Sequence, residues 1–393
     1  MSEKAQYKIG ILTYHENTIN TGSLLQAHSI YNLINDIIES ADVEIIDYRS
    51  RNMALRPIFG MYLSRFSPLY ISKFFNYHKS ILNNMKKKGV LSKKRMITND
   101  NKKALDFIKE QNYDMIVVGS DVVWSIYNNQ RWYTFYNPYP NPYFLDSSID
   151  AIKVSYAAAS SSSTSLSTMS KAEINKLRRR LCDFDKISVR GAHAEKLTKK
   201  LGITNVTRVP DPTIVYELPD IEVSDKLMSL GVDFDKPIMG TYKCRELTKS
   251  VCKHYRDKGY QIVAMHHSKY ADVNLYGKLT PLEYYSAHKH FDMVVSGSLH
   301  STIFSIKNNT PFVTLDSSKL DTVDKKESLL DDFSLRDRHI KLAKEKDQKS
   351  IFRKIENCEK ELDRKHVNKR LIKLRKIGLD YLNEVKELLY GER

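Results

Sequence analysis

The segment 293–315 constrains the fold more than any other part of this 393-residue chain. The apolar run 293–295 continues through the small residues 296–298 into a short helix that begins near His300, and a second apolar run occupies 312–315. Two short apolar runs joined by a helix are typical of neighbouring strands in a parallel sheet. The segment therefore predicts an α/β fold in which His300 lies at a strand-to-helix corner.

A corner of this kind favours an anionic ligand. The N–H groups of the first helical turn lack intrahelical partners, and the helix dipole is positive there. Ligands of open α/β sheets bind outside the carboxyl ends of the strands. Ser298 and Ser301 flank His300 with small side chains that would let a ligand approach. A lone histidine in this position is either a functional group or a buried residue that satisfies its neighbours, and the pattern leaves both interpretations open.

Strand and helix patterns alternate along most of the chain. Strands are predicted at 8–12, 43–47, 113–118, 152–159, 186–190, 238–241, 261–266, 293–295 and 312–315, mostly with helical patterns between them. Prolines 210, 212 and 219 mark a boundary between domains. We expect two doubly wound domains around a cleft, at 1–209 and 210–346. Residues 347–393 show helical spacing and are expected to pack back across both domains.

Polar residues follow several predicted strands of the first domain. The turn around Asn20 leads to Gly22 and Ser23 at a helix start, where serine suits the N-cap. The other candidates at strand ends are Gly119, Ser120, Asp121, Ser160 and Arg190. The serine run at 160–163 suits either a sugar or phosphate pocket or a flexible linker. Arg190 is either a guanidinium fork for a carboxylate or phosphate or an ordinary surface charge.

Composition narrows the class of protein. An apolar content of 41% supplies ordinary globular cores, and the four cysteines show no C-x-x-C spacing. These features favour a reducing compartment and argue against zinc. No stretch has the length or apolar character of a spanning helix, and no signal peptide precedes the first strand, so we expect a cytoplasmic protein.

The formal net charge of +16 is concentrated in one place. Residues 51–99 contain eleven lysines and arginines, no acidic residue and several interleaved aromatic residues. We expect a basic helical insertion here, which either lies on an anionic membrane surface or binds acidic ligands, or is simply a set of solvated helices with aromatic cores. Nucleic acid is disfavoured because no recognition motif accompanies the charge.

Six blocks of the chain resemble the polysaccharide pyruvyl transferases, in that family's order. They are NTGSLLQAHSIYNLI at 20–34, DMIVVGSDVVW at 114–124, KVSYAAAS at 153–160, ISVRGAHAEKL at 187–197, VPDPTIV at 209–215 and VVSGSLHSTIFSIKNNTPFV at 294–313. The resemblance implies two Rossmann-like domains of the glycosyltransferase-B kind. It also implies transfer of the enolpyruvyl carbons of phosphoenolpyruvate to a hexose of a cell-surface polysaccharide or its precursor, with a pyruvate ketal as product and no further cofactor.

The resemblance also assigns roles to particular residues. It makes His300 the general acid or base and Arg190 a ligand of phosphoenolpyruvate. A further cation follows the strand after the histidine in the family, and Lys319, Lys325 and Lys326 are the candidates here. The family arginine two positions before the histidine is replaced by Ser298, so one expected anion contact is missing or comes from elsewhere.

Two other functions fit parts of the pattern. A sugar-nucleotide glycosyltransferase could use the same two-domain fold, although no acidic residue stands at a convincing ribose-binding spacing in the second domain. A non-catalytic protein could bind anionic membranes or glycans through residues 51–99 and would not need His300. The sequence leaves the acceptor sugar, its attachment to lipid or nucleotide, and the oligomeric state open.

Overall fold

The computed structural model describes residues 6–15, 21–54, 81–126, 141–161, 166–244, 247–318, 325–345 and 347–391. They form two compact units. Unit 1 comprises Met1–Tyr216 and Leu374–Arg393, and unit 2 comprises Glu217–Lys373. The boundary predicted after residue 209 lies shortly before this division.

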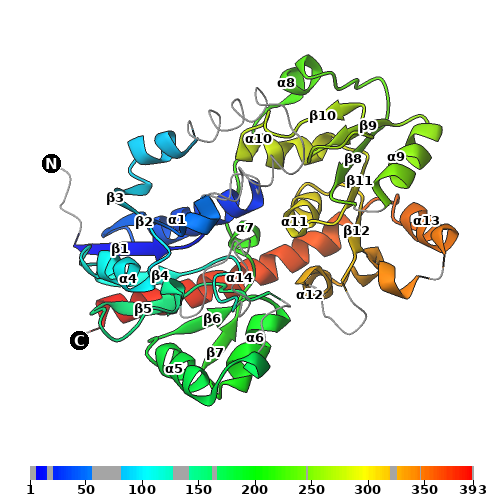
Figure 1. Cartoon of the computed structure of the whole chain (residues 1–393). Helices are drawn as coiled ribbons and strands as arrows, with labels where there is room; N and C mark the ends of the chain where they lie inside the picture. The colour runs from blue at the N-terminus through cyan, green and yellow to red at the C-terminus, as the bar shows by residue number, and fades with distance from the viewer. Residues whose placement is uncertain are drawn as a thin grey trace. The chain divides into compact units, whose positions relative to one another are not determined.

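Unit 1 is built on a parallel sheet with the strand order β3-β2-β1-β4-β5 (Figure 1). The strands are β1 (Tyr7–Leu12), β2 (Ala41–Arg49), β3 (Leu91–Ile97), β4 (Met115–Val118) and β5 (Ile152–Ser155). All four residues of β4 are buried, as expected for a central parallel strand covered on both faces. Helices α1 (Thr21–Ile37) and α4 (Asn101–Lys109) connect these strands.

A smaller parallel pair extends unit 1. Strands β6 (Ile187–Val189) and β7 (Val206–Arg208) pair with each other, and parallel bridges from Val154 to Lys186 and from Ala158 to Val189 connect β6 to the segment of β5. Helices α5 (Lys171–Cys182) and α6 (Gly191–Lys200) accompany this pair, and the short helix α7 (Pro212–Val215) follows it. The carboxyl ends of β4, β5 and β6 therefore lie along one edge.

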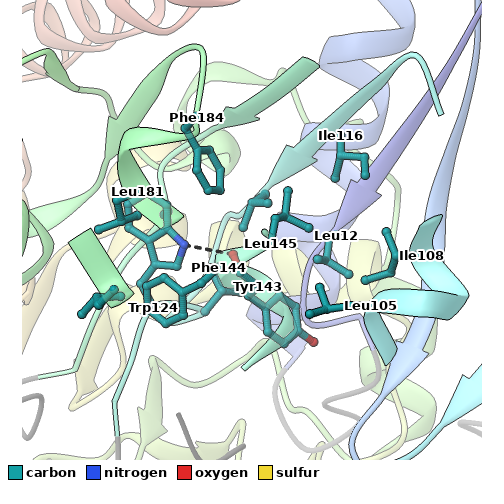
Figure 2. Close-up of a cluster of buried hydrophobic side chains, with 14 of the residues drawn as sticks. Leu12, Leu105, Ile108, Ile116, Trp124, Tyr143, Phe144, Leu145, Leu181 and Phe184 are labelled. Carbon is teal, nitrogen blue, oxygen red and sulfur yellow. Dashed lines mark hydrogen bonds between the residues drawn. The ribbon is translucent and has the colours of Figure 1, made fainter. Parts of the chain in front are cut away.

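Trp124 anchors one apolar core of unit 1 (Figure 2). Its side chain is fully buried, it stacks on Phe144 at 6.0 Å between ring centroids, and its indole N–H donates to the Tyr143 carbonyl at 3.2 Å. The loop after β4 and the segment around Tyr143 are thereby fixed to each other. Trp124 is thus a core residue.

Unit 2 contains a six-stranded parallel sheet with the order β10-β9-β8-β11-β12-β13. Its strands are β8 (Ile238–Tyr242), β9 (Gln261–Ala264), β10 (Val273–Asn274), β11 (Met293–Ser296), β12 (Phe312–Asp316) and β13 (His339–Lys341). The accompanying helices are α8 (Ser224–Ser229), α9 (Thr248–Asp257), α10 (Pro281–Ser286), α11 (Leu299–Lys307) and α12 (Lys325–Phe333). The strand order reverses between β8 and β11, which is where doubly wound sheets bind their ligands.

The C-terminal segment forms α13 (Gln348–Asn357) and the long helix α14 (Arg364–Tyr390). Ile351 and Ile355 of α13 pack into the core of unit 2. Helix α14 begins in unit 2, where the His366 ring contacts the Phe333 carbonyl at 2.8 Å. It ends in unit 1, where the Tyr381 hydroxyl donates to the Ser155 carbonyl at 2.8 Å.

The insertion predicted as helical at 51–99 ends in a strand, so this part of the prediction is wrong. Residues 91–97 form β3, the edge strand that pairs with β2. Leu91 and Ser92 are buried and the lysines at 93 and 94 are exposed. Exposed lysines on an edge strand prevent pairing with another chain, so the cluster of cations fits this position. The aromatic residues between 59 and 77 lie outside the described residues.

Candidate active site

Several predicted site residues of unit 1 meet at the carboxyl end of β4. Asp121 follows β4, and its carboxylate accepts hydrogen bonds from the Ser23 hydroxyl and, at 2.7 Å, from the Val122 N–H. Ser23 and the preceding Gly22 belong to the first turn of α1 and are buried. Gly119 has φ +114°, and a Cβ there would collide with the carbonyl oxygen of Tyr156. The absence of a side chain at Gly119 thus lets the two strand ends approach.

Arg190 extends this group from the end of β6. Its side chain is only 11% exposed and forms an ion pair with Asp211. Asp211 also accepts hydrogen bonds from the Gln26 amide at 2.6 Å, the Thr213 N–H at 2.9 Å and the Thr213 hydroxyl at 2.7 Å. Burial lowers the pKa of Arg190 to about 10, and the negative charge of Asp121 opposes this shift. Arg190 therefore remains a cation at neutral pH, beside two carboxylates.

We call Ser23, Gln26, Asp121, Arg190 and Asp211 the Asp121 cluster. The sequence indicated three of its members and missed Gln26 and Asp211. Gln26 lies one helical turn after Ser23, and that spacing could have revealed it. Asp211 is the N-cap of α7, and the Asp-Pro-Thr sequence was interpreted as a domain boundary instead of a helix start.

Two serine hydroxyls beside the Asp121 cluster are buried without a hydrogen bond to any described residue. They are those of Ser120 and Ser160. Ser120 precedes Asp121, and Ser160 follows Ala159, whose N–H donates to the Asp121 carbonyl at 2.9 Å. Buried hydroxyls normally find a partner in protein, water or ligand. Both predicted residues are therefore placed where a polar ligand would find hydrogen-bonding groups.

In unit 2, His300 lies at the predicted strand-to-helix corner. It is the second residue of α11 and is 7% exposed, with its ring 6.0 Å from that of Phe304. The N-cap residue Ser298 makes no side-chain hydrogen bond to the helix. The hydroxyl at the predicted ligand position is thus not used for capping α11, and the first-turn N–H groups keep their partial positive charge.

The hydroxyl of Ser301 contacts a second histidine. Ser301 is fully buried, and its Oγ lies 3.1 Å from Nε2 of His288, whose Nδ1 lies 2.9 Å from the Tyr284 carbonyl. Burial lowers the pKa of His288 to about 4. His288 is therefore neutral at pH 7, donates through Nδ1 and accepts from Ser301. The substrate-binding role predicted for Ser301 stays a prediction. Its contact with His288 joins α11 to the segment that precedes β11.

A cation that the sequence did not indicate lies beside this corner. Lys243 follows β8, has φ +55°, and is exposed. A Cβ on Gly297 would lie 2.6 Å from the Lys243 carbonyl oxygen, so the ends of β8 and β11 touch because residue 297 is glycine. Burial, then the charge of Lys243, lowers the pKa of His266 to about 4. Lys243 thus stands at the switch point of the sheet.

Two of the three lysines predicted to bind the donor lie among the described residues. Lys325 and Lys326 form the first turn of α12, where Lys325 is exposed and Lys326 is buried. Lys319 and Asn20 lie outside the described residues. Arg190 belongs to unit 1 and His300 to unit 2. Their expected shared contact with one ligand stays a prediction.

No group of three or more histidine, cysteine, aspartate or glutamate side chains in the described ranges could hold a metal ion. Within the same ranges, none of the helices combines the length and apolar character needed to cross a membrane.

The six sequence blocks lie within, or close to the ends of, a region that matches a known protein family. A sequence model of the family "Polysaccharide pyruvyl transferase" matches residues 20–319. The chain belongs to this family. The match confirms the resemblance and shows a transferase of polysaccharide biosynthesis in general terms. No curated protein gives a significant sequence match.

Solved structures show the fold type. Sucrose-phosphate synthase from Thermosynechococcus elongatus has a TM-score of 0.55 at 11% identity, covering 98% of this chain and 100% of its own. The UDP-GlcNAc 2-epimerase of Methanocaldococcus jannaschii has a TM-score of 0.54 at 13% identity, covering 98% and 99%. The UDP-GlcNAc 2-epimerase of Neisseria meningitidis, bound to UDP-GlcNAc, has a TM-score of 0.50 at 12% identity, covering 98% and 100%. At such identities the likeness shows the fold alone, and it confirms the predicted glycosyltransferase-B type.

Proposed function

We propose that this transferase moves the enolpyruvyl carbons of phosphoenolpyruvate onto two hydroxyls of a hexose and forms a pyruvate ketal. The observation that carries the proposal is the position of His300 in the first turn of α11, at the switch point of a parallel sheet. An imidazole exchanges protons near neutral pH, and a helix N-terminus favours an anion. Phosphoenolpyruvate needs both, because it is an anion whose methylene carbon must be protonated.

The bonds and protons of the reaction balance without a metal or redox cofactor. A proton adds to the methylene carbon, one sugar hydroxyl attacks the adjacent carbon, phosphate leaves, and the second hydroxyl closes the ketal. The two hydroxyls release two protons, which equal the proton on the new methyl group and the proton taken up by phosphate. We assign the proton transfer to the carbon to His300.

Cations at two places could bind the anionic groups of the donor. Arg190 is a buried guanidinium that can form a planar fork with a carboxylate or phosphate. Lys243 lies at the end of β8 beside Gly297 and can supply the positive charge that Ser298 lacks. Within unit 2, we assign contacts with the carboxylate or phosphate of phosphoenolpyruvate to Lys243 and to the N–H groups at the start of α11. For Arg190 we keep the donor-binding role that the family resemblance implies.

Calorimetry separates this proposal from the alternatives. The whole protein is titrated with phosphoenolpyruvate, with UDP-glucose and with liposomes of anionic lipid, each alone. Binding of phosphoenolpyruvate supports the pyruvyl transferase. Binding of UDP-glucose without phosphoenolpyruvate would favour a sugar-nucleotide glycosyltransferase, which solved structures with UDP-sugars make the nearest competitor. Binding of liposomes alone would favour a non-catalytic protein.

A turnover assay tests the chemistry. The protein is incubated with phosphoenolpyruvate and a panel of hexosides, and the products are analysed by mass spectrometry and by phosphate release. The expected product gains the mass of pyruvic acid less one water and releases one phosphate per ketal. Phosphate release without this product would contradict the proposal.

A further inference from the structure

The solvent-facing side of helix α14 carries lysines without described partners. Residues 364–379 of this helix include seven lysines and arginines and no acidic residue. Lys365, Lys369 and Lys373 are exposed, and among the described residues none of their ammonium groups has an ion-pair partner. All three belong to unit 2. This part of α14 therefore carries a positive charge that no described carboxylate pairs with.

An exposed apolar side chain lies among these lysines. Ile372 is 68% exposed, which is the largest exposed fraction of any large apolar side chain among the described residues. It follows Lys365 by seven positions and Lys369 by three, and residues at these spacings lie on the same side of a helix. Lys373 is its immediate neighbour in the chain. We call Lys365, Lys369, Ile372 and Lys373 the α14 patch.

Hydrogen bonds on another side of α14 keep this patch turned toward solvent. The ring of His366 contacts the Phe333 carbonyl at 2.8 Å, and the Arg370 guanidinium donates to the Ser334 hydroxyl at 2.7 Å. The helix cannot turn Ile372 inward without breaking these contacts. A single exposed isoleucine is common on protein surfaces. One that is fixed among lysines without described partners combines an apolar side chain with positive charge, which are the two properties that binding to an anionic lipid surface requires.

An anionic lipid surface is complementary to the α14 patch in charge and in polarity. Lysines near such a surface are attracted by the lipid head groups, and an aliphatic side chain between them can enter the boundary between head groups and acyl chains. The methylene stems of the lysines can lie along apolar surface while their ammonium groups stay among the head groups. Single-stranded nucleic acid would instead favour aromatic rings for stacking, and residues 364–380 contain no phenylalanine, tyrosine or tryptophan.

We propose that the α14 patch docks on a membrane surface of anionic lipid. The three lysines contact the head groups, and Ile372 enters the layer beneath them. The attachment is peripheral and reversible, because one aliphatic side chain is too little for stable anchoring. This surface differs from the basic stretch at 51–99, and the proposal does not depend on the reaction proposed above. Docking would bring the enzyme to the surface on which a lipid-linked acceptor lies.

Sedimentation with vesicles tests the proposal on the full chain. The vesicles contain phosphatidylcholine alone or phosphatidylcholine with phosphatidylglycerol, and the salt concentration is varied. In one variant the three lysines of the α14 patch are changed to Gln. In the matched control Lys196, Lys199 and Lys200 are changed to Gln, which removes the same charge from exposed positions of α6, a helix without an exposed large apolar side chain. Thermal unfolding of each variant is first compared with that of the parent.

The parent should bind anionic vesicles about tenfold or more tightly than neutral ones, and ~0.5 M salt should abolish most of the difference. The lysine variant of α14 should lose about tenfold or more of this binding, whereas the α6 control should lose less than about threefold. Ile372→Gln should lose about threefold to tenfold, because it removes the apolar contact. Met228→Gln, at another exposed apolar position of unit 2, should bind like the parent.

Three results would overturn the proposal. The first is a parent that does not bind anionic vesicles. The second is an equal loss in the α14 lysine variant and the α6 control, which would show attraction by the overall charge. The third is parental binding in both α14 variants, which would assign the contact to another basic part of the chain, such as 51–99. Turnover with a soluble hexoside separates this proposal from the proposed function, because it should equal the parental rate in every variant.

Discussion

The two units place different chemistry at the carboxyl ends of their strands. In unit 1, Asp121 and Asp211 are buried together with Arg190, and each carboxylate has described partners. At the α11 corner of unit 2, His300 lies between the hydroxyl residues Ser298 and Ser301, and the described residues of α11 include no carboxylate. Charges in unit 1 are thus compensated within the fold, whereas the described residues of α11 place no carboxylate in its first turn.

This difference suggests that the two units have different roles in the reaction. Paired charges hold a rigid geometry, but a ligand gains less from a cation that already has a carboxylate partner. A helix N-terminus whose first turn carries no carboxylate leaves its N–H groups to an incoming anion. We therefore expect chemistry to depend most on unit 2 and positioning to depend most on unit 1.

The largest effect should follow from His300→Gln. Loss of proton transfer should lower the rate of ketal formation about 10²–10⁴-fold. The matched control is His290→Gln, which changes a histidine at the amino end of β11 instead of its carboxyl end. Turnover of purified proteins with equal thermal unfolding checks the prediction, and near-parental turnover of His300→Gln would remove His300 from the mechanism.

Arg190 tests the role assigned to unit 1. Arg190→Ala should weaken phosphoenolpyruvate binding about tenfold to a hundredfold, because a charge-assisted contact contributes roughly 1.5–3 kcal/mol. Arg190→Lys should restore only part of this, because lysine cannot form the planar fork. Arg208→Ala, on the neighbouring strand β7, is the control. Unchanged binding of phosphoenolpyruvate in both Arg190 variants would make the arginine purely structural.

His288 tests whether the stability of the fold depends on a neutral imidazole in unit 2. Its pKa is about 4 in the fold and near 6.5 when unfolded, so the unfolded chain binds more protons between these values. The free energy of unfolding should therefore fall by on the order of 2 kcal/mol as pH drops from 6.5 to 4. His288→Gln should show a smaller fall in denaturant titrations across this range. An identical pH dependence in parent and variant would contradict the assignment.

Lys243 should have a smaller effect, because it is exposed to solvent. Lys243→Gln should raise the KM for phosphoenolpyruvate about three- to tenfold with little change in kcat, and Lys243→Arg should retain most of the affinity. Lys269→Gln, also exposed and in the same unit, provides the control. A fall in kcat with unchanged KM would show that Lys243 does not act through donor binding.

Removal of divalent metal should have the smallest effect. Cationic side chains can neutralise the leaving phosphate in the proposed reaction, so turnover in a chelator should equal turnover without it. Adding magnesium or manganese to the chelated enzyme should not raise the rate. A rate that falls in chelator and recovers with either metal would show that a metal ion contributes.

Many residues of both candidate sites could be predicted because they come directly after predicted strands. Buried apolar runs indicated β4, β6 and β11, and residues that follow parallel strands lie at the carboxyl edge of their own sheet, so local sequence indicated Asp121, Arg190 and His300 as candidates. The strand predicted at 152–159 ends at Ser155 because the chain turns at Ala157, which has φ +50°. Alanine gives no local signal for such a turn.

The groups that local sequence did not reveal depend on distant partners. Asp47 and Arg49 alternate along β2 as exposed residues of a strand would, yet both are buried, and Asp47 pairs with His15 and Arg95 from two other segments. The strand identity of β3 likewise depends on pairing with β2, since a run of lysines and arginine has no strand pattern of its own.

The end of α14 has a consequence for how the protein is made. Tyr381, Leu382, Val385 and Leu389 belong to a core of unit 1 that also contains residues of β1 and β2. A Cβ on Gly378 would lie 2.5 Å from Val215, so the helix sits tightly on unit 1. The part of unit 1 before Tyr216 therefore lacks some of its core until α14 has been synthesised. A chain released after Tyr216 would expose that apolar face and be prone to aggregate, so unit 1 cannot complete its fold before unit 2 has been synthesised.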